Sequence, residues 1–339
     1  MQVHGSREIL VGSGRCPGEP EVYQLHKRMA LSKACFKEDI QERVAETIKK
    51  FGMIEPGDKV VIGLSGGKDS YVLLDVLARV HDTGKIIGVS IVEGIPGYNK
   101  PGDIEYMRRL ASERGVDVVV TSIREYVGHS LYEIVMRAWK RGFRISACTY
   151  CGLLRRRIIN HYARIYGASK TATAHNLDDE AQTMLANVFR GDLMGLVRQN
   201  PLAPRLSDKF IHKIKPLRYV YEYEAALYAA VDGFKFQDTE CMFITYAPTF
   251  RARIREVLYK LEESYPGIVL NIVQTIDEIT SRVVGEIKGS SLPNCSLCGE
   301  PTNQGRSICK LCEILGNAGI TSPIYQVNLK EYRGIINLL

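Results

Sequence analysis

The pattern of apolar and polar positions predicts a strand, a glycine turn and a helix within residues 59–80. Residues 60–64 form a short apolar run rich in β-branched side chains, which is typical of a buried parallel strand. Ser65-Gly66-Gly67 then allows a sharp turn, because glycine has no Cβ to block it. Beyond the turn, apolar side chains recur at helical spacing, at Val72, Leu73, Val76, Leu77 and Val80.

The same alternation of strand and helix patterns continues along the chain. Strand-like runs at 86–92, 116–121 and 169–174 alternate with helical patterns at 104–114, 131–140, 153–166 and 177–189. This alternation predicts an α/β fold with a doubly wound parallel sheet. In such sheets ligands bind at the carboxyl ends of the strands, near a reversal of strand order. We therefore expect the loops after Leu64, Val92 and Ala174 to surround one crevice.

The remaining patterns divide the chain into four parts. A polar segment ends in a predicted helix at 38–51, and residues 191–216 form a proline-containing excursion without a clear period. Helical patterns return at 221–231, 250–263 and 268–284, and a Gly/Ser/Pro-containing linker spans 289–293. We predict an N-terminal region (1–54), a catalytic domain (55–288), a C-terminal four-cysteine module (289–320) and a tail (321–339).

Composition excludes several classes of protein. The chain has 339 residues, 45% hydrophobic and 24% charged, as is usual for globular proteins. It contains no apolar run of about 18 residues and no visible secretory signal, so we expect a cytoplasmic protein without a membrane span. Residues 137–164 carry eight Lys or Arg and no acid, which suits a nucleic acid and is also compatible with solvated helix faces.

The glycine turn has the features of a phosphate site. Residues 65–70, Ser-Gly-Gly-Lys-Asp-Ser, expose backbone N–H groups at the start of a helix, where the helix dipole favours an anion. The segment is not a Walker A loop, since Gly63 and Gly67 are one residue too close and Lys68 precedes Asp69 rather than Ser or Thr. A tight connection without a ligand is the alternative interpretation.

Cysteine spacing predicts a structural zinc site near the C-terminus. Two Cys-x-x-Cys pairs, Cys295 with Cys298 and Cys309 with Cys312, supply four thiolates for tetrahedral Zn²⁺. Such a site is closed and leaves no position for catalysis.

A second zinc site is possible near the N-terminus. Cys16 and Cys35 are each followed three residues later by a glutamate, Glu19 and Glu38. His4 and His26 are also nearby in sequence. Carboxylate and imidazole both bind zinc, but two ordinary thiols would give the same pattern.

The third Cys-x-x-Cys pair, Cys148 and Cys151, lies within the basic stretch at the start of a predicted helix. It suits a redox dithiol or half of a metal site. Cys241 is the only cysteine left over, and three cysteines can hold a [4Fe–4S] cluster with one iron free of protein ligands, whereas such clusters usually have four.

Acidic residues gather where the strand pattern at 169–174 ends. Asn176 is a natural N-cap, and Asp178, Asp179 and Glu180 follow in the first helical turn, where the dipole favours negative charge. Capping explains such residues. Alternatively, one carboxylate faces the crevice and binds Mg²⁺ or assists the reaction.

These motifs together resemble the tRNA 2-thiolation enzymes of the TtcA/TtuA type, a group of PP-loop ATP pyrophosphatases, and in particular the zinc-bearing TtuA branch. The resemblance rests on the 65–70 loop, Cys148-x-x-Cys151-Gly-Leu-Leu-Arg-Arg, the segment 175–192, Cys241 and the terminal cysteines. It implies a [4Fe–4S] cluster on Cys148, Cys151 and Cys241. It also implies an ATP site formed by Ser65, Gly66, Gly67, Lys68, Asp69 and Ser70, with Ser90 and His175.

The resemblance implies a two-stage reaction on tRNA. AMP is transferred from ATP to the C2 oxygen of a uridine, and sulfur then displaces AMP. Asp178, Arg155 and Lys68 take the catalytic positions, and Mg²⁺ accompanies ATP. The sulfur donor would be a thiocarboxylated ubiquitin-like protein or free sulfide, and a homodimer is expected. Leu177 favours the T-loop uridine at position 54 over the wobble uridine at position 34.

Two features depart from the family pattern. The N-terminal finger usually has a complete Cys-x-x-Cys and Cys-x-x-His set, but Glu19 and Glu38 occupy its second and fourth positions, which leaves its zinc open. Some relatives have lysine at Arg155, whose permanent charge suits an electrostatic contact rather than proton transfer. Two further hypotheses are an ATP pyrophosphatase or amidotransferase acting on a small molecule, and a non-catalytic zinc-ribbon RNA-binding protein.

Overall fold

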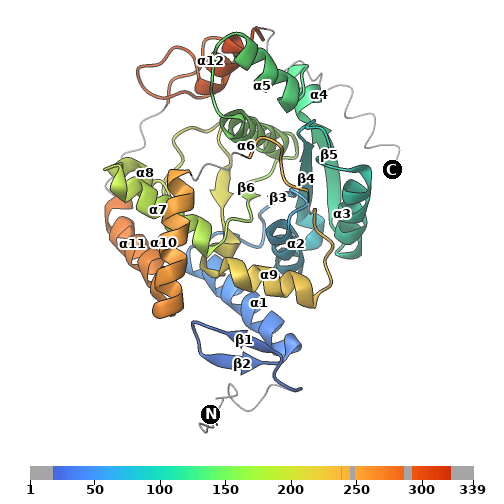
Figure 1. Ribbon diagram of the computed structural model, residues 1–339, viewed down its shortest axis with the longest axis vertical. Coiled ribbons are helices and arrows are strands. Elements are labelled where there is room, and N and C mark those ends of the chain that lie inside the picture. Colours follow the sequence, from blue (N-terminus) through green and yellow to red (C-terminus); the bar gives the residue numbers. More distant parts are fainter. Residues whose placement is uncertain (1–17, 238, 245–248, 286–291, 322–339) are drawn as a thin grey trace, which may run out of the picture.

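A five-stranded parallel sheet forms the centre of the protein (Figure 1). The computed structural model describes residues 18–237, 239–244, 249–285 and 292–321. The strand order is β5-β4-β3-β6-β7, and every neighbouring pair is parallel. The strands are β3 (Val60–Gly63), β4 (Ile86–Val92), β5 (Asp117–Ser122), β6 (Lys170–Ala172) and β7 (His212–Ile214). The predicted α/β fold with a doubly wound sheet is confirmed.

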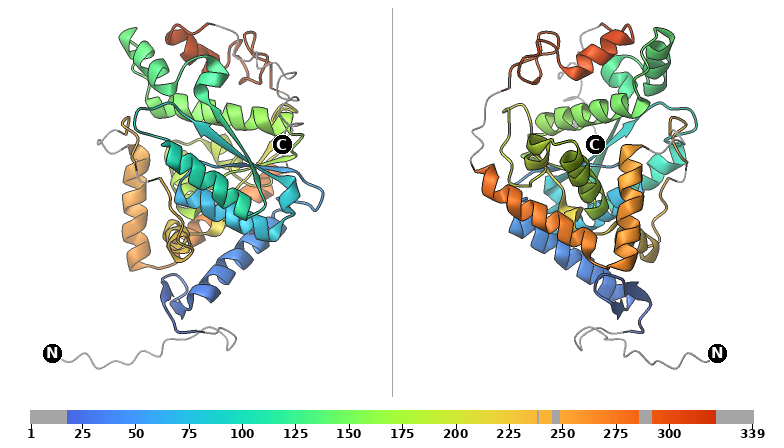
Figure 2. Two further views of the ribbon diagram at one scale, coloured as in Figure 1. Left: turned by 90° about the vertical axis from the view of Figure 1, so that its right-hand side faces the viewer. Right: turned by 60° about the vertical axis from the view of Figure 1, so that its left-hand side comes forward.

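Helices cover both faces of the sheet, as two of the views make clear (Figure 2). Side chains alternate along β3, so that Val60 and Ile62 join one apolar cluster and Val61 joins the other. The first cluster includes residues of α1 (Lys33–Lys50), α2 (Lys68–Val80), α3 (Pro101–Glu113), α7 (Leu177–Phe189) and α9 (Glu222–Val231). The second includes residues of α4 (Ile123–Val127), α5 (Leu131–Lys140), α6 (Ala147–Ile165) and α12 (Lys310–Asn317).

Three further helices pack beside α7 and complete its side of the molecule. They are α8 (Leu193–Val197), α10 (Phe250–Ser264) and α11 (Ile268–Val284). Short 3₁₀ turns occur at η1 (Thr83–Lys85) and η2 (Pro216–Tyr219). A hairpin of β1 (Val22–Gln24) and β2 (Met29–Leu31) lies at the opposite end of the molecule from α12 (Figure 1). No helix in the described ranges is both long and apolar enough to cross a membrane.

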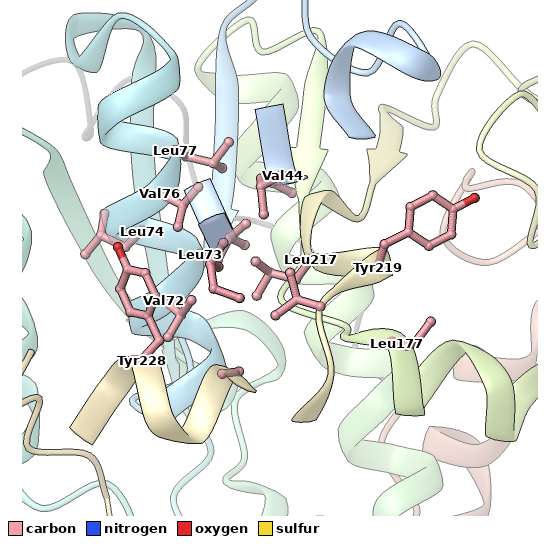
Figure 3. Packing of buried hydrophobic residues seen from close by; sticks show 14 of the residues in the cluster. Val44, Val72, Leu73, Leu74, Val76, Leu77, Leu177, Leu217, Tyr219 and Tyr228 are labelled. Carbon is pink, nitrogen blue, oxygen red and sulfur yellow. The ribbon is translucent and has the colours of Figure 1, made fainter. Parts of the chain in front are cut away.

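The apolar face of α2 is the centre of the larger core (Figure 3). Leu73 and Leu77 of α2 are fully buried, as are Val44 of α1 and Leu217 of η2. Burying a side chain of this size contributes about 1.5–3 kcal/mol. The helix α1 therefore shares the core of the catalytic domain, and the boundary placed at residue 54 separates no second core.

The helix α1 also begins earlier than the pattern indicates. It starts at Lys33 instead of residue 38, because the hydroxyl of Ser32 caps it by accepting the N–H of Cys35. Similarly, α6 starts at Ala147 rather than residue 153, because the hydroxyl of Ser146 accepts the N–H of Cys148 and caps the helix. Cys148 and Cys151 therefore both lie at the start of this helix.

The excursion at 191–216 contains two elements that the pattern did not predict. They are α8 and the edge strand β7. The strand is only three residues long and pairs with β6 through its backbone, so its side chains carry no alternating signal. Strand β6 itself ends at Ala172 rather than 174. The predicted linker at 289–293 and the tail lie mostly outside the described residues.

A buried ion network joins α7, η2 and α11. The guanidinium of Arg218, which has no exposed surface, donates to carboxylate oxygens of Glu180 and Asp277. Tyr219 also donates to Asp277, at 2.9 Å. Because removal of one partner would leave a buried charge uncompensated, these side chains hold the three elements in register. The network fixes α7, whose first turn faces the sheet edge described next.

Candidate active site

The carboxyl ends of β3 and β6 lie side by side at the point where the strand order reverses. From β3 the chain builds outward through β4 and β5, and it then returns to place β6 on the other side of β3. The loop after β3 thus faces the loop after β6, as doubly wound sheets require at their ligand site. A side-chain contact links the two loops, since Asn176 Nδ2 lies 3.4 Å from Asp69 Oδ1. The predicted meeting of these loops is confirmed.

The loop after β3 presents a free helix N-terminus. Gly66 has a φ of +80°, a conformation that favours glycine. Gly67 caps α2 without any side-chain acceptor, so the first N–H groups of the helix remain available to an anion. The loop is held from outside, where the N–H of Gln237 donates to the carbonyl of Gly66 at 3.0 Å. The hydroxyl of Ser70 donates a hydrogen bond to the carbonyl of Gly67 at 2.7 Å.

Lys68 lies at the mouth of this loop between two carboxylates. Its Nζ is 3.0 Å from Asp69 Oδ2 and 3.5 Å from Glu222 Oε1. Burial opposes the charged form of Lys68, but the two carboxylates outweigh it and raise the pKa above the usual value. Lys68 is therefore a permanent cation next to the free N–H groups.

Helix α10 supplies residues that the sequence analysis missed. Arg255 and Tyr259, one turn apart, both contact Glu222 Oε2 at 2.7 Å, and Arg251 pairs with Asp179. The signal was present as basic residues at helical spacing, but nothing in the sequence places α10 beside the loop. The helix therefore brings two arginines to the acidic side of the crevice.

The three acids of the first turn of α7 have three different surroundings. Asp179 forms a capping box with Asn176, so the capping interpretation holds for this residue. Glu180 is buried in the ion network with Lys215 and Arg218. Asp178 accepts the N–H of Glu222 at 2.7 Å. Burial, followed by the nearby charges of Glu222 and Asp179, raises the pKa of Asp178 to about 6.

His175 and Ser90 are the other two residues that were predicted to bind the nucleotide. His175 Nδ1 lies 2.9 Å from the hydroxyl of Thr173, and burial, with Lys213 and Lys215 beside it, lowers its pKa to about 3. His175 is therefore neutral at physiological pH. Ser90 is buried within β4, where it pairs in register with Val120 of β5.

The cysteines of α6 and Cys241 lie on the same side of the sheet. Cys148 is exposed, Cys151 and Cys241 are partly buried, and all three are free thiols. Phe243, two residues after Cys241, packs against Tyr132 and Trp139 of α5 with ring centroids 6.1 and 5.9 Å apart. Cys151, Cys241 and Phe243 all pack against the same apolar cluster, and burial, followed by the charge of Glu93, raises the pKa of the nearby Tyr98 phenol.

The three cysteines of this side differ from the C-terminal four in how closely they gather. Only the C-terminal cysteines gather within 4.8 Å among the described residues that could hold a metal. Thiolates that share one zinc ion must be this close. Each cysteine of a cubane binds a different iron, so its ligands stand further apart. Cys148, Cys151 and Cys241 are free thiols, which is the donor type that an iron–sulfur cluster requires.

Arg155 lies between Cys151 and a buried carboxyl group. Its Nε is 3.6 Å from Glu93 Oε1, and its guanidinium can donate to the thiolate of Cys151. Burial raises the pKa of Cys151 to about 11, while Arg155 opposes this shift. Glu93, directly after β4, is only 3% exposed, and its Oε2 has no hydrogen-bond partner within the described structure. The sequence analysis missed Glu93, although a carboxylate just after a buried strand was a usable signal.

The C-terminal cysteines form a closed four-sulfur site. The Sγ atoms of Cys295, Cys298, Cys309 and Cys312 lie within 4.8 Å of one another. Arg157 of α6 donates to Cys298 Sγ at 3.7 Å and to Cys309 Sγ at 3.8 Å. Four thiolates around Zn²⁺ carry a net charge of −2, which the guanidinium partly offsets. The four thiolates fit structural zinc, and the contacts from Arg157 attach the module to α6.

The described residues contain no second metal site at the N-terminal end. Cys35 is buried in the first turn of α1 and Glu38 is exposed, while Cys16 lies outside the described residues. His26 faces Tyr223, whose hydroxyl is 3.0 Å from Nδ1, and burial lowers the pKa of His26 to about 4. His26 thus has another role, and zinc at Cys16 and Cys35 stays a prediction.

Comparison with known proteins gives consistent matches across the chain. A family model described as a PP-loop domain matches residues 36–262. The cytoplasmic tRNA 2-thiolation protein 1 of Aspergillus niger is 33% identical over 300 residues, covering 87% of this chain and 85% of that protein. The tRNA-5-methyluridine(54) 2-sulfurtransferase of Pyrococcus horikoshii is 30% identical over 301 residues, covering 89% and 92%.

A solved structure matches as well. The U34-tRNA thiolase NcsA from Methanococcus maripaludis, solved with its [4Fe–4S] cluster, superimposes with a TM-score of 0.74 at 27% identity. The match covers 92% of this chain and 98% of that chain.

The raised pKa of Asp178 predicts a pH dependence. The carboxylate is charged above about pH 6 and protonated below it, so a reaction that needs the carboxylate should slow as the pH falls through 6. We expect the rate of ATP cleavage to AMP, measured from pH 5 to 8, to rise to a plateau with this midpoint.

The variant Asp178→Asn should lower that rate by about 10²–10⁴-fold. The matched control Asp179→Asn alters the neighbouring cap and should retain a pH midpoint, shifted below 6 because the Asp179 charge that helps to raise the Asp178 pKa is removed. An unchanged midpoint in Asp178→Asn would contradict the role given to Asp178.

Proposed function

The chain belongs to the PP-loop family, and from this premise we propose that it is an ATP-dependent tRNA sulfurtransferase that makes 2-thiouridine. The observation that carries the proposal is the convergence of three sites at one sheet edge. The nucleotide loop follows β3, Glu93 follows β4 and contacts Arg155 of α6, and Asp178 follows β6. The names of the two curated relatives and of the matching solved structure support the same activity.

In the first stage the uridine oxygen becomes a leaving group. We propose that the C2 oxygen attacks the α-phosphorus of ATP, that the bond to pyrophosphate breaks, and that the N3 proton passes to the Asp178 carboxylate. Lys68 and the open N-terminus of α2 would hold the phosphates and offset the negative charge that develops on pyrophosphate. Asp69 would help to hold Mg²⁺, which would further offset the negative charge of the phosphates.

In the second stage sulfur replaces oxygen at C2. When bound by Cys148, Cys151 and Cys241, a [4Fe–4S] cluster supplies an open iron at which hydrosulfide can be held. Hydrosulfide adds to C2, the bond from C2 to the AMP oxygen breaks, and the sulfur-borne proton moves to N3. Arg155 would contribute a fixed positive charge near the departing AMP, and Glu93 would orient it through the contact at 3.6 Å.

Partners and cofactors follow from the same proposal. We propose tRNA as substrate, a thiocarboxylated ubiquitin-like protein or sulfide as the donor, and zinc at the C-terminal cysteines. The relatives named as cytoplasmic support a cytoplasmic location. A homodimer stays a prediction. The small-molecule and non-catalytic hypotheses account for neither the three free cysteines nor the relatives' names.

The target position has two candidates. The resemblance at Leu177 favours position 54, which is also the position named for the Pyrococcus horikoshii relative. Leu177 is fully buried, so it is a family marker rather than a contact to tRNA. The solved thiolase that matches in fold is named for U34, which favours the wobble uridine as the second candidate. We propose position 54.

Metal analysis tests the cofactor assignment. After anaerobic reconstitution, the wild type should hold about four irons and one zinc per chain. Cys241→Ala should lose most of its iron and keep its zinc, because its four-cysteine module is intact. Cys309→Ser is the matched control and should show the reverse loss of zinc. A wild type free of iron would contradict the proposed mechanism.

Mapping of modified nucleosides tests the position. In tRNA from a strain that lacks this gene, mass spectrometry of nuclease fragments should show loss of 2-thiouridine from the T-loop and retention in the anticodon. Complementation with the wild-type gene should restore it, and with the Asp178→Asn variant should not. Loss at the anticodon alone would replace position 54 by position 34.

A further inference from the structure

A second cavity lies beside the crevice, between α6, the segment 198–213 and the C-terminal module. Its volume is about 740 Å³, which is in the range of sites that hold a nucleotide-sized ligand. No aspartate or glutamate of the described chain lines it. The cationic residues of its wall are Arg156, Arg157, Arg198, Arg205, Lys213, Arg306 and Lys310.

Four of these cations have no carboxylate partner among the described residues. Arg156, Arg198, Arg205 and Lys213 make no ion pair there, whereas Arg306 and Lys310 both pair with Glu313. Lys213 is exposed at the wall, where desolvation by the surrounding protein and the positive charge of Lys215 lower its pKa to about 8. Cations crowded in this way repel one another, and a polyanion would relieve the repulsion.

The rest of the wall suits a nucleotide chain. Phe210, Leu206 and Pro204 give apolar surface on which bases or riboses can lie. Three of the four unpaired cations are arginines, whose planar guanidinium matches a phosphate in two hydrogen bonds. An acidic peptide would offer carboxylates but no flat rings for the apolar surface.

The wall is also held in place by the fold. Asn160 of α6 donates to the carbonyl of Lys209 at 2.9 Å and accepts the N–H of Ile211 at 2.8 Å. Asn200 is buried and donates to the hydroxyl of Thr280 at 2.7 Å. Both ends of the segment are therefore fixed before any ligand arrives, which lowers the entropic cost of binding.

The cavity reaches the edge of the sheet where the chemistry is placed. Thr173, directly after β6, lines the cavity and bonds His175, three residues before Asp178. We propose that this cavity binds the phosphate backbone of the tRNA strand next to the target uridine, with the C-terminal module as its outer wall. The inference rests on the proposed function, because it takes tRNA as the polyanion.

A double variant tests this site by RNA affinity. Arg198→Ala with Arg205→Ala removes two exposed cations of the cavity, and Lys49→Ala with Arg108→Ala removes two exposed cations of α1 and α3 as the matched control. The probe is unmodified, fluorescein-labelled tRNA transcript, titrated with holoenzyme at several salt concentrations and followed by anisotropy. Isothermal titration with ATP checks the nucleotide site and the fold.

We expect the cavity variant to bind tRNA about tenfold more weakly, with a log–log salt slope shallower by about 1.4–1.8 for two lost phosphate contacts. The control should change neither quantity, and ATP affinity should stay within about twofold in both variants. Unchanged tRNA affinity in the cavity variant would overturn the inference. A tenfold loss of ATP affinity would also overturn it, since the cavity would then serve the nucleotide.

Failure of the proposed function is a separate result. A wild type that binds tRNA but inserts no sulfur would contradict the function, while the comparison of binding between the two double variants would still decide the cavity.

Discussion

The adjacency of β3 and β6 is the constraint on which the rest of the site depends. The sheet extends from β3 through β4 and β5 on one side and through β6 and β7 on the other. Because the strands are parallel, the loops after β3 and β6 meet at the same edge, and the phosphate loop lies opposite the acid-rich start of α7. Because β3 and β6 are short, the packing of the surrounding helices keeps their ends at this edge. The face of α2 packs against α1 and η2, and Arg218 ties α7 to α11.

The acidic residues in the first turn of α7 divide into two that are paired with arginines and one, Asp178, that forms no ion pair within the described residues. Asp179 and Glu180 are neutralised by Arg251 and Arg218, so their charges serve the fold. Asp178 has a raised pKa and remains available for chemistry. On the other side of the sheet, Arg155 lies between Glu93 and Cys151, and Arg157 donates to two of the C-terminal cysteines. One helix, α6, thus carries the Cys148 and Cys151 pair and also contacts the C-terminal module.

The sequence predicted most of the fold, because the apolar period is strong in β4, α5, α7 and α11. It also predicted the phosphate loop and the four-cysteine site, whose chemistry is local in sequence. It could not predict β7, which is held by backbone pairing at a sheet edge. Glu93, Arg255 and the cavity were missed for a related reason. They depend on which elements pack together, and no local pattern records that packing.

The central claim is that ATP activates the C2 oxygen of a uridine and that sulfur then displaces this oxygen as part of AMP. The direct measurement uses a tRNA transcript that carries ¹⁸O at C2 of the target uridine, incubated with holoenzyme, ATP and sulfide. We expect one ¹⁸O atom in the phosphate of AMP for each 2-thiouridine formed, and none in pyrophosphate. Thiolated tRNA with unlabelled AMP would contradict the account, because the oxygen would then have left without adenylation.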